Sequence, residues 1–229
     1  MISHSSTSDR FAIAIDGPAA SGKSTLARKL ATRLGLVMVN SGAMYRAVTW
    51  QALQEKIDPA DAAAVIAMMD RVTLHGGEIG VTSNITIDGV DPSAELRSEA
   101  INANVSAISA IPEVRNRLVQ LQRNYLDHTS IIMEGRDIGS VVFPETPYKI
   151  YVDADETVRA ARRSHGGEVD SVAKRDAADS EREHAPLMIA TGAVVLDTSD
   201  LSIEGAVEAA LEILKHQGLP LLDEPTVAV

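Results

Sequence analysis

The sequence predicts an α/β protein built around a parallel β-sheet, and two patterns support this prediction. Five short apolar runs, each typical of a buried strand, are spread along the 229 residues. Most of them lie next to stretches with the helical spacing of apolar residues, and strands that alternate with helices form parallel sheets. The predicted strands are residues 11–15, 37–39, 131–133, 149–152 and 194–196.

Two of the predicted helices have clear boundaries. Leu26, Leu30 and Leu34 recur every four residues and form one apolar face, and Gly35 ends that helix. A helix after the last strand begins at Ser202, a residue type that caps helix N-termini. Its apolar face consists of Ile203, Val207, Leu211 and Leu214.

One segment interrupts this alternation of strands and helices. Residues 72–90 read VTLHGGEIGVTSNITIDGV, with alternating β-branched residues, clustered glycines and the pair Asp88-Gly89. All three features are hairpin signals. We therefore expect a small antiparallel insertion here.

Composition restricts the class of protein. A chain of 229 residues fits a single domain with small insertions, and the absence of cysteine fits a reducing, cytoplasmic location. The net charge of −11 argues against binding to long nucleic acid. The polar N-terminus does not resemble a signal peptide, and no apolar run is long enough to span a membrane. We also expect a monomer, because no long apolar helix face is left exposed.

Residues 17–24, GPAASGKS, match the phosphate-binding pattern G-x-x-x-x-G-K-[ST] between a predicted strand and a predicted helix. In such a loop, backbone N–H groups surround an anion and the helix N-terminus adds its dipole. Lys23 is expected to contact the β- and γ-phosphates, and Ser24 to bind Mg²⁺. The pattern indicates a P-loop NTPase-type core. The expected ATP-binding residues here are Gly17, Pro18, Ala19, Ala20, Ser21, Gly22, Lys23, Ser24 and Thr25.

A phosphate acceptor would need further cations, and three places offer them. Arg46 follows the second strand, and Arg136 with Asp137 follows the third, where ligands collect in open α/β sheets. Residues 159–182 carry six basic side chains in an otherwise acidic chain. Each of these could also be an ordinary surface charge. Their occurrence beside a phosphate-binding loop favours a second anion site.

Five segments in this order resemble the bacterial cytidylate kinase family, over about residues 11–214. They are GPAASGKST, NSGAMYRAVT, EGRDIGSVVFP, RDAADSEREHAPL and DTSDLSIE. The resemblance implies a five-stranded parallel sheet in the order 2-3-1-4-5, with helices on both faces. It also implies a core of about residues 11–68, 110–158 and 190–216, a nucleoside-monophosphate-binding insertion at about 69–109 and a short lid at about 159–182.

The same resemblance implies a reaction in which ATP phosphorylates CMP or dCMP, with Mg²⁺. Phosphates would be held by Arg46, Arg136 and Arg182. Ser106, Arg115 and Asp137 would contact the cytosine. Ser41, Arg175 and Asp179 would face the acceptor's sugar and its surroundings. Arg159 and Arg163 would belong to the lid over ATP, and Lys23, Arg136, Arg163 and Arg182 would be catalytic.

The chemistry fits these residue types. The nucleophile would be a phosphate oxygen, which is already anionic near pH 7 because the second pKa of a phosphate monoester is about 6. Catalysis then depends on alignment and charge neutralisation, which lysine, arginine and Mg²⁺ supply.

Two features depart from the family pattern. Asn40 stands where the family usually has Asp, and the lid stretch between Arg163 and Arg175 is short. A nucleotide-binding protein without catalysis stays open because of these two features. A kinase for another small acceptor, such as UMP, stays open as well.

Overall fold

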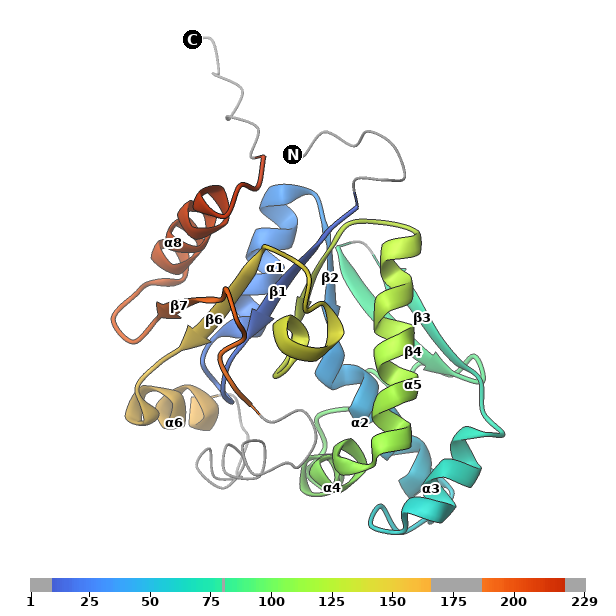
Figure 1. Cartoon of the computed structure of the whole chain (residues 1–229). Helices are drawn as coiled ribbons and strands as arrows, with labels where there is room; N and C mark the ends of the chain where they lie inside the picture. The colour runs from blue at the N-terminus through green and yellow to red at the C-terminus, as the bar shows by residue number, and fades with distance from the viewer. Residues whose placement is uncertain (1–9, 80, 166–186, 221–229) are drawn as a thin grey trace.

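The computed structural model, which describes residues 10–79, 81–165 and 187–220, has an α/β fold around one seven-stranded sheet (Figure 1). The strand order is β3-β4-β2-β5-β1-β6-β7. The strands are β1 Ala12–Asp16, β2 Val37–Asn40, β3 Leu74–Ile79, β4 Thr82–Ile87, β5 Ile131–Glu134, β6 Lys149–Asp153 and β7 Val194–Asp197.

The sheet contains the five expected parallel strands and two more. The order across all seven strands differs from the expected five-strand order, because the β3–β4 hairpin is added beside β2. Among the parallel strands alone, β2-β5-β1-β6-β7 corresponds to 2-3-1-4-5 when they are counted along the chain. The predicted topology therefore describes the core, and the hairpin extends it.

Each parallel strand ends one residue later than its apolar run. The additional residues are Asp16, Asn40, Glu134, Asp153 and Asp197. All five are polar, so a search for apolar runs stops before them, whereas the backbone pairing continues through them. The carboxyl edge of the sheet therefore carries a row of carboxylate and amide side chains.

Helices cover both faces of the sheet, as expected. The helices are α1 Lys23–Leu34, α2 Ser41–Gln54, α3 Ala62–Met69, α4 Glu99–Ala110, α5 Pro112–Arg123, α6 Glu156–His165 and α8 Ile203–His216, with a 3₁₀ turn at Asn124–Asp127 (η1) and a π turn at Ile138–Val142 (η2). The predicted cap is confirmed, since the Ser202 hydroxyl accepts a hydrogen bond of 3.0 Å from Gly205 N at the start of α8. Gly35 ends α1 with a φ of 69°.

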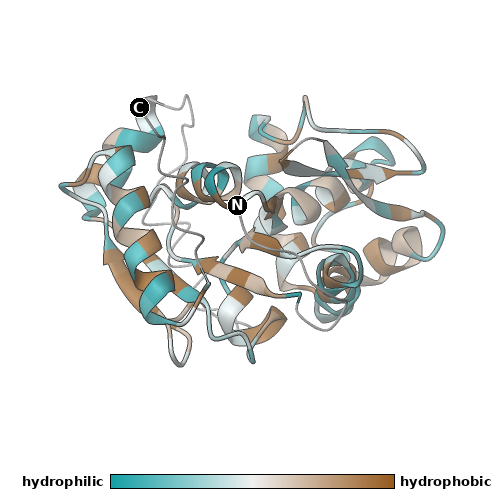
Figure 2. Ribbon diagram, turned by 90° about the horizontal axis from the view of Figure 1, so that it is seen from above, coloured by the Kyte–Doolittle hydropathy of each residue, from teal (hydrophilic) through white to brown (hydrophobic). Residues whose placement is uncertain are grey.

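The two faces of the sheet bury two separate apolar cores. Ile13 and Ile15 of β1 pack with α1 and α8, while Ala12 and Ala14, which point the opposite way, pack with α2 and α5. This division follows from the two-residue alternation of strand side chains. Figure 2 shows hydrophobic strands at the centre of the molecule, flanked by helices on both sides.

The expected hairpin is present. β3 and β4 are antiparallel, and β4 contacts the main sheet where Met38 N donates a 2.8 Å hydrogen bond to Val81 O. The Asp88-Gly89 pair also forms a tight turn with positive φ at both residues, but this turn follows β4 instead of joining β3 to β4. None of the helices in the described ranges combines the length and apolar character that crossing a bilayer requires.

Candidate functional site

A cleft of about 880 Å³ lies at the carboxyl edge of the parallel strands. The loop after β1 and the segment after β5 line it, together with α2 and the helical region that follows the hairpin. This is where open α/β sheets bind ligands, because loops that leave neighbouring strands on opposite sides of the sheet separate there.

The loop after β1 has the backbone expected of a phosphate-binding loop. Gly17 has a φ of +145°, and a Cβ at this position would lie 2.0 Å from the carbonyl oxygen of Val152. Gly22 precedes α1 with a φ of 96°. Neither position tolerates a side chain without strain, because both backbones lie where L residues rarely occur.

Helix α1 directs its N-terminus into this cleft. It begins at Lys23, as expected, and its first turn contains Ser24 and Thr25. The Lys23 ammonium donates a hydrogen bond of 2.5 Å to the Pro18 carbonyl, which holds it across the mouth of the loop. The loop, the helix N-terminus and the ammonium together favour an anion.

A carboxylate that the sequence analysis did not identify lies next to this loop. The Ser24 hydroxyl donates a hydrogen bond of 2.7 Å to Glu134, the last residue of β5. Asn40 is the register partner of Glu134 on β2, and its side chain accepts a 2.9 Å hydrogen bond from Ala43 N to cap α2. This edge of the cleft therefore places a hydroxyl, a carboxylate and an amide side by side, and oxygen donors of this kind suit Mg²⁺.

Arg46, on α2, extends towards the segment that follows the hairpin. Its Nη1 donates to the Leu96 carbonyl at 2.9 Å and to the Asn102 side-chain oxygen at 2.6 Å. Arg46 lines the cleft together with Arg97. The guanidinium is therefore fixed in direction by neutral acceptors, so these contacts do not neutralise its charge.

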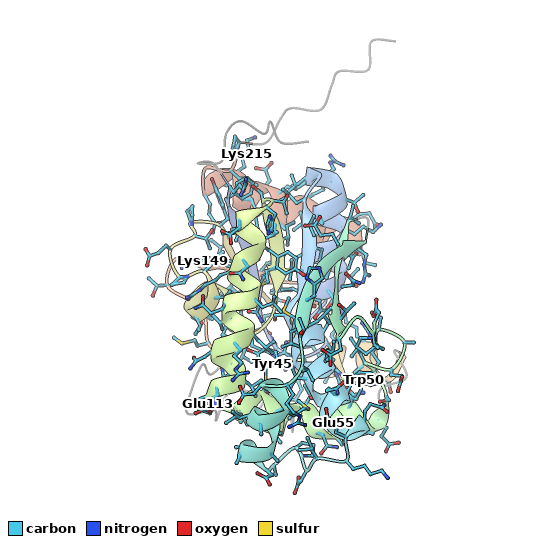
Figure 3. The ribbon with its side chains drawn as sticks, turned by 90° about the vertical axis from the view of Figure 1, so that its right-hand side faces the viewer. Tyr45, Trp50, Glu55, Glu113, Lys149 and Lys215 are labelled. Carbon is cyan, nitrogen blue, oxygen red and sulfur yellow. The ribbon has the colours of Figure 1, made fainter. Side chains whose placement is uncertain are left out.

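Arg115 and Asp137 form a buried ion pair at the cleft wall, with side chains 6% and 8% exposed. Arg115 also donates to the Ser109 carbonyl at 3.2 Å and lies 5.5 Å above the ring of Tyr45, which gives a cation–π contact. Tyr45 is labelled in Figure 3, where it lies between the α2 and α5 ribbons. Ser106 lines the same wall.

The segment that contains Arg136 and Asp137 is attached to β1. Asp16 accepts hydrogen bonds of 2.8 Å from Ile138 N and 2.7 Å from Gly139 N. Burial raises the pKa of Asp16 to about 6, against the opposing effect of these two amide bonds. The nearby Asp137 carboxylate raises this pKa further, and Lys23 lowers it.

Helix α6 covers the outer side of the phosphate-binding loop. Arg159 donates to the Ala19 carbonyl at 3.2 Å. Arg162, a residue that the sequence analysis did not select, donates to the hydroxyl and carbonyl oxygens of Thr198 at 3.1 and 2.8 Å. Thr198 in turn donates to the Ser21 carbonyl at 3.0 Å, so the loop after β7 is joined to the phosphate-binding loop.

The structure brings most of the expected site residues into one cleft. Its lining includes Ala19, Ala20, Ser21, Gly22, Lys23, Ser24, Thr25, Ser41, Arg46, Ser106, Arg115, Arg136, Asp137 and Arg163. Gly17, Pro18 and Arg159 support the lining from outside it. Arg175, Asp179 and Arg182 lie outside the described residues, as does the lid beyond residue 165.

Comparison with known proteins identifies the family. The cytidylate kinase family profile matches residues 13–216. The chain is similar to a cytidylate kinase of Streptomyces avermitilis, with 40% identity over 214 residues that cover 90% of this chain and 93% of the relative. It is equally similar to a cytidylate kinase of Caldanaerobacter subterraneus, with 40% identity over 216 residues that cover 89% and 94%. It follows that the chain belongs to the cytidylate kinase family.

Proposed function

We propose that the protein transfers a phosphoryl group from ATP to CMP or dCMP and so forms ADP and CDP or dCDP. The observation that carries this proposal is the arrangement of one cleft. A loop with the backbone of a phosphate-binding loop lines one side, and further arginines and the buried Arg115–Asp137 ion pair line the other. Two phosphorylated ligands can then meet between Lys23 and Arg136. The family membership of the chain supports the same reaction.

The donor side begins with residues 17–25. We assign the triphosphate to this loop, where Lys23 neutralises charge as the γ-phosphoryl group moves. Arg163, which is 8% exposed on the cleft wall, supplies a further cation from α6. Arg159 acts from behind the loop by holding the Ala19 carbonyl.

The acceptor side uses the opposite wall. Arg46 and Arg136 are assigned to the acceptor phosphate, and Ser41 to its sugar. Asp137 accepts a hydrogen bond from the exocyclic amine of cytosine, which is the pairing by which carboxylates read this base in nucleic acids. Arg175, Asp179 and Arg182 complete the proposed set from outside the described residues.

Selectivity between cytosine and uracil is expected to be moderate. Uracil presents an acceptor where cytosine presents a donor, so it would lose its bond to Asp137. However, Asp137 is paired with Arg115. The carboxylate therefore keeps a charged partner when the wrong base binds, and the penalty is the loss of one hydrogen bond instead of an unpaired buried charge.

The residues at the edge of the sheet also fit a magnesium ion. Ser24 and Glu134 offer hard oxygen donors 2.7 Å apart, and in the described part of the chain no three His, Asp or Glu side chains form a separate metal cluster. We infer that Ser24, with Glu134 beside it, holds Mg²⁺ together with the phosphates of ATP. When bound, the ion neutralises charge on the β- and γ-phosphates.

The parts of the chain divide between these tasks. We propose a core of about residues 11–68, 110–158 and 190–216, an acceptor-binding insertion at about 69–109 and a lid at about 159–182. The insertion then contains the hairpin and most of α4, both of which contribute lining residues. The lid begins in α6, and its closure over ATP would exclude water from the γ-phosphate.

A coupled assay of ADP release tests the proposal. The purified protein is mixed with ATP, Mg²⁺ and, in separate reactions, CMP, dCMP, UMP, AMP or GMP. The proposal requires that CMP or dCMP gives the highest kcat/KM. Preference for UMP would favour the alternative acceptor, and absence of turnover with every acceptor would favour a nucleotide-binding protein without catalysis.

A further inference from the structure

Asp16 is a buried carboxylate that the proposed reaction does not use. It ends β1, is 4% exposed, and accepts hydrogen bonds from two consecutive amides, Ile138 N and Gly139 N. A Cβ added at Gly139 would lie 3.3 Å from the Asp16 carboxylate and 3.2 Å from the Lys149 stem. The carboxylate and the start of η2 are therefore packed in direct contact.

These bonds hold one end of the segment that contains Arg136 and Asp137. The other end is held by Gly135 N, which donates a 3.0 Å hydrogen bond to the Ile15 carbonyl. Two consecutive residues of β1 thus anchor the segment just before and just after its two functional side chains. The backbone of Arg136 and Asp137 therefore cannot move away from β1 without breaking one of these anchors.

The turn that follows makes this anchor necessary. In η2, Phe143 N donates to the Ile138 carbonyl at 2.7 Å, so the amides at the start of the turn need acceptors from elsewhere. A buried amide without a partner is costly, and a carboxylate is a stronger acceptor than a carbonyl. Because Asp16 binds two neighbouring amides at once, it fixes the orientation of the backbone as well as its position.

The anchor acts on one side of the cleft. The phosphate-binding loop is held by backbone pairing of Asp16 with Tyr151 and by the packing of Gly17 against Val152, and neither depends on the Asp16 side chain. Removing the carboxylate should therefore disturb the segment after β5 and leave the backbone of residues 17–24 in place, while the Lys23 ammonium loses the attraction of one nearby negative charge.

We propose that Asp16 is a positioning residue for the acceptor, which sets the direction of Arg136 and Asp137 from the end of β1. This inference rests on the proposed function for the identity of the acceptor, CMP. It adds Asp16, at the end of the strand that leads into the phosphate-binding loop, to the residues that determine the geometry of the CMP-binding side of the cleft.

Steady-state kinetics of Asp16→Asn test the inference. The shape is kept, but an amide cannot accept from both Ile138 N and Gly139 N as the carboxylate does. We expect kcat/KM for CMP to fall by about 10- to 100-fold, the scale of a misplaced reactant, while the KM for ATP changes by less than about twofold. The control is Asp61→Asn, which alters an exposed carboxylate cap that accepts from Ala64 N at 3.0 Å, and it should leave both constants unchanged. The inference would be overturned if the variant bound ATP as much more weakly as it used CMP less efficiently, or if kcat/KM for CMP were unchanged.

Hydrogen exchange without nucleotide separates this inference from the proposed function. In Asp16→Asn, the amides of residues 135–143 should exchange faster than in the wild type, while those of residues 17–24 keep their rates. This measurement needs no acceptor. If the wild-type protein fails to phosphorylate CMP, the proposed function is contradicted, but the exchange rates still decide whether Asp16 anchors the segment. Unchanged exchange at 135–143 would reject the anchor.

A second variant approaches the same contact from the opposite side. Gly139→Ala places a methyl group 3.3 Å from the Asp16 carboxylate, 3.2 Å from the Lys149 stem and 3.3 Å from the Ala190 Cβ. These contacts are tighter than usual, so we expect η2 to shift by a few tenths of an ångström against β1. We expect kcat/KM for CMP to fall in this variant and the KM for ATP to stay close to the wild-type value. If Asp16→Asn does not fold, this variant decides the question, and wild-type kinetics for Gly139→Ala would count against the anchor.

Discussion

The Ser24 hydroxyl and the Glu134 carboxylate are joined by a hydrogen bond of 2.7 Å that connects the phosphate-binding loop to the end of β5. Ser24 belongs to a sequence motif, whereas Glu134 was left out of the predicted strand and of the predicted site. The bond places a carboxylate next to the hydroxyl to which we assign Mg²⁺. We therefore expect substitution of Glu134 to weaken the binding of Mg²⁺.

Glu134→Gln should therefore raise the Mg²⁺ concentration required for half-maximal activity. Loss of a charged partner beside a metal ligand commonly weakens metal affinity by about 10- to 100-fold, and we expect a shift of that size. The measurement is a Mg²⁺ titration of CMP phosphorylation at saturating nucleotides. Glu113→Gln, at an exposed position on α5, serves as the control, and identical titrations for both variants would remove Glu134 from the metal site.

Lys23→Ala should reduce kcat much more than it reduces acceptor affinity. The ammonium spans the mouth of the loop and strengthens its contacts as charge develops on the moving phosphoryl group. We expect a loss of about 10²-fold or more in kcat, as for the removal of one preorganised donor. Lys29→Ala, on the exposed side of α1, should retain wild-type turnover. Near-normal kcat in Lys23→Ala would contradict the assignment of the loop.

Asp137→Asn should narrow the preference for CMP over UMP. The carboxylate accepts from the cytosine amine, and because Arg115 already pairs with it, we expect the ratio of kcat/KM values to fall by about 5- to 10-fold, the value of one hydrogen bond. The fall should come mainly from lost CMP activity, with ATP affinity nearly constant. Asp70→Asn removes an exposed partner of Arg117 and should leave the ratio as it is; an unchanged ratio in Asp137→Asn would make Asp137 a structural partner of Arg115.

The pH dependence of stability should reveal Asp16. Its pKa is about 6 in the folded protein against an ordinary 3.8, so between these two pH values the folded state binds more protons than the unfolded state. The free energy of unfolding therefore decreases as the pH rises from about 4 to 6, by about 3 kcal/mol from this group, and stays lower above that range. The charged groups that face Asp16 are Asp137 and Lys23. Both are present in the wild type and in Asp16→Asn, so a comparison of the two proteins isolates the contribution of the Asp16 carboxylate.

Denaturant unfolding at pH 4.5 and pH 7.5 measures this difference. Asp16→Asn should gain stability relative to the wild type as the pH increases, even though it loses activity towards CMP. A stability difference between the two proteins that is independent of pH would show that Asp16 keeps an ordinary pKa in the fold.

The sequence predicted the core well because apolar runs and helical spacing depend on neighbouring residues. It placed all five parallel strands, and it missed the last residue of each strand because polar side chains such as Glu134 interrupt the apolar pattern while the backbone continues. It recognised the β3–β4 hairpin but not its attachment to β2, which is a contact between distant segments.

The same limit applies to the candidate site. Lys23 and Arg46 lie in recognisable local patterns, so the sequence identified them. Asp16 bonds to amides more than 120 residues away, and Arg162 joins the phosphate-binding loop through Thr198. Such contacts depend on how the strands are ordered in the sheet, so no local pattern could indicate them.

The position of the hairpin also protects the acceptor wall from unwanted strand pairing. Without β3 and β4, β2 would be an edge strand with free backbone groups next to Ser41, and open edges recruit strands from other molecules. The hairpin moves that edge about 10 Å away, the width of two strands. The new edge, β3, carries His75, Glu78 and paired glycines, which are poor templates for a further strand. The added strands therefore replace the open side of β2 with an edge that is less prone to pair with strands of other molecules.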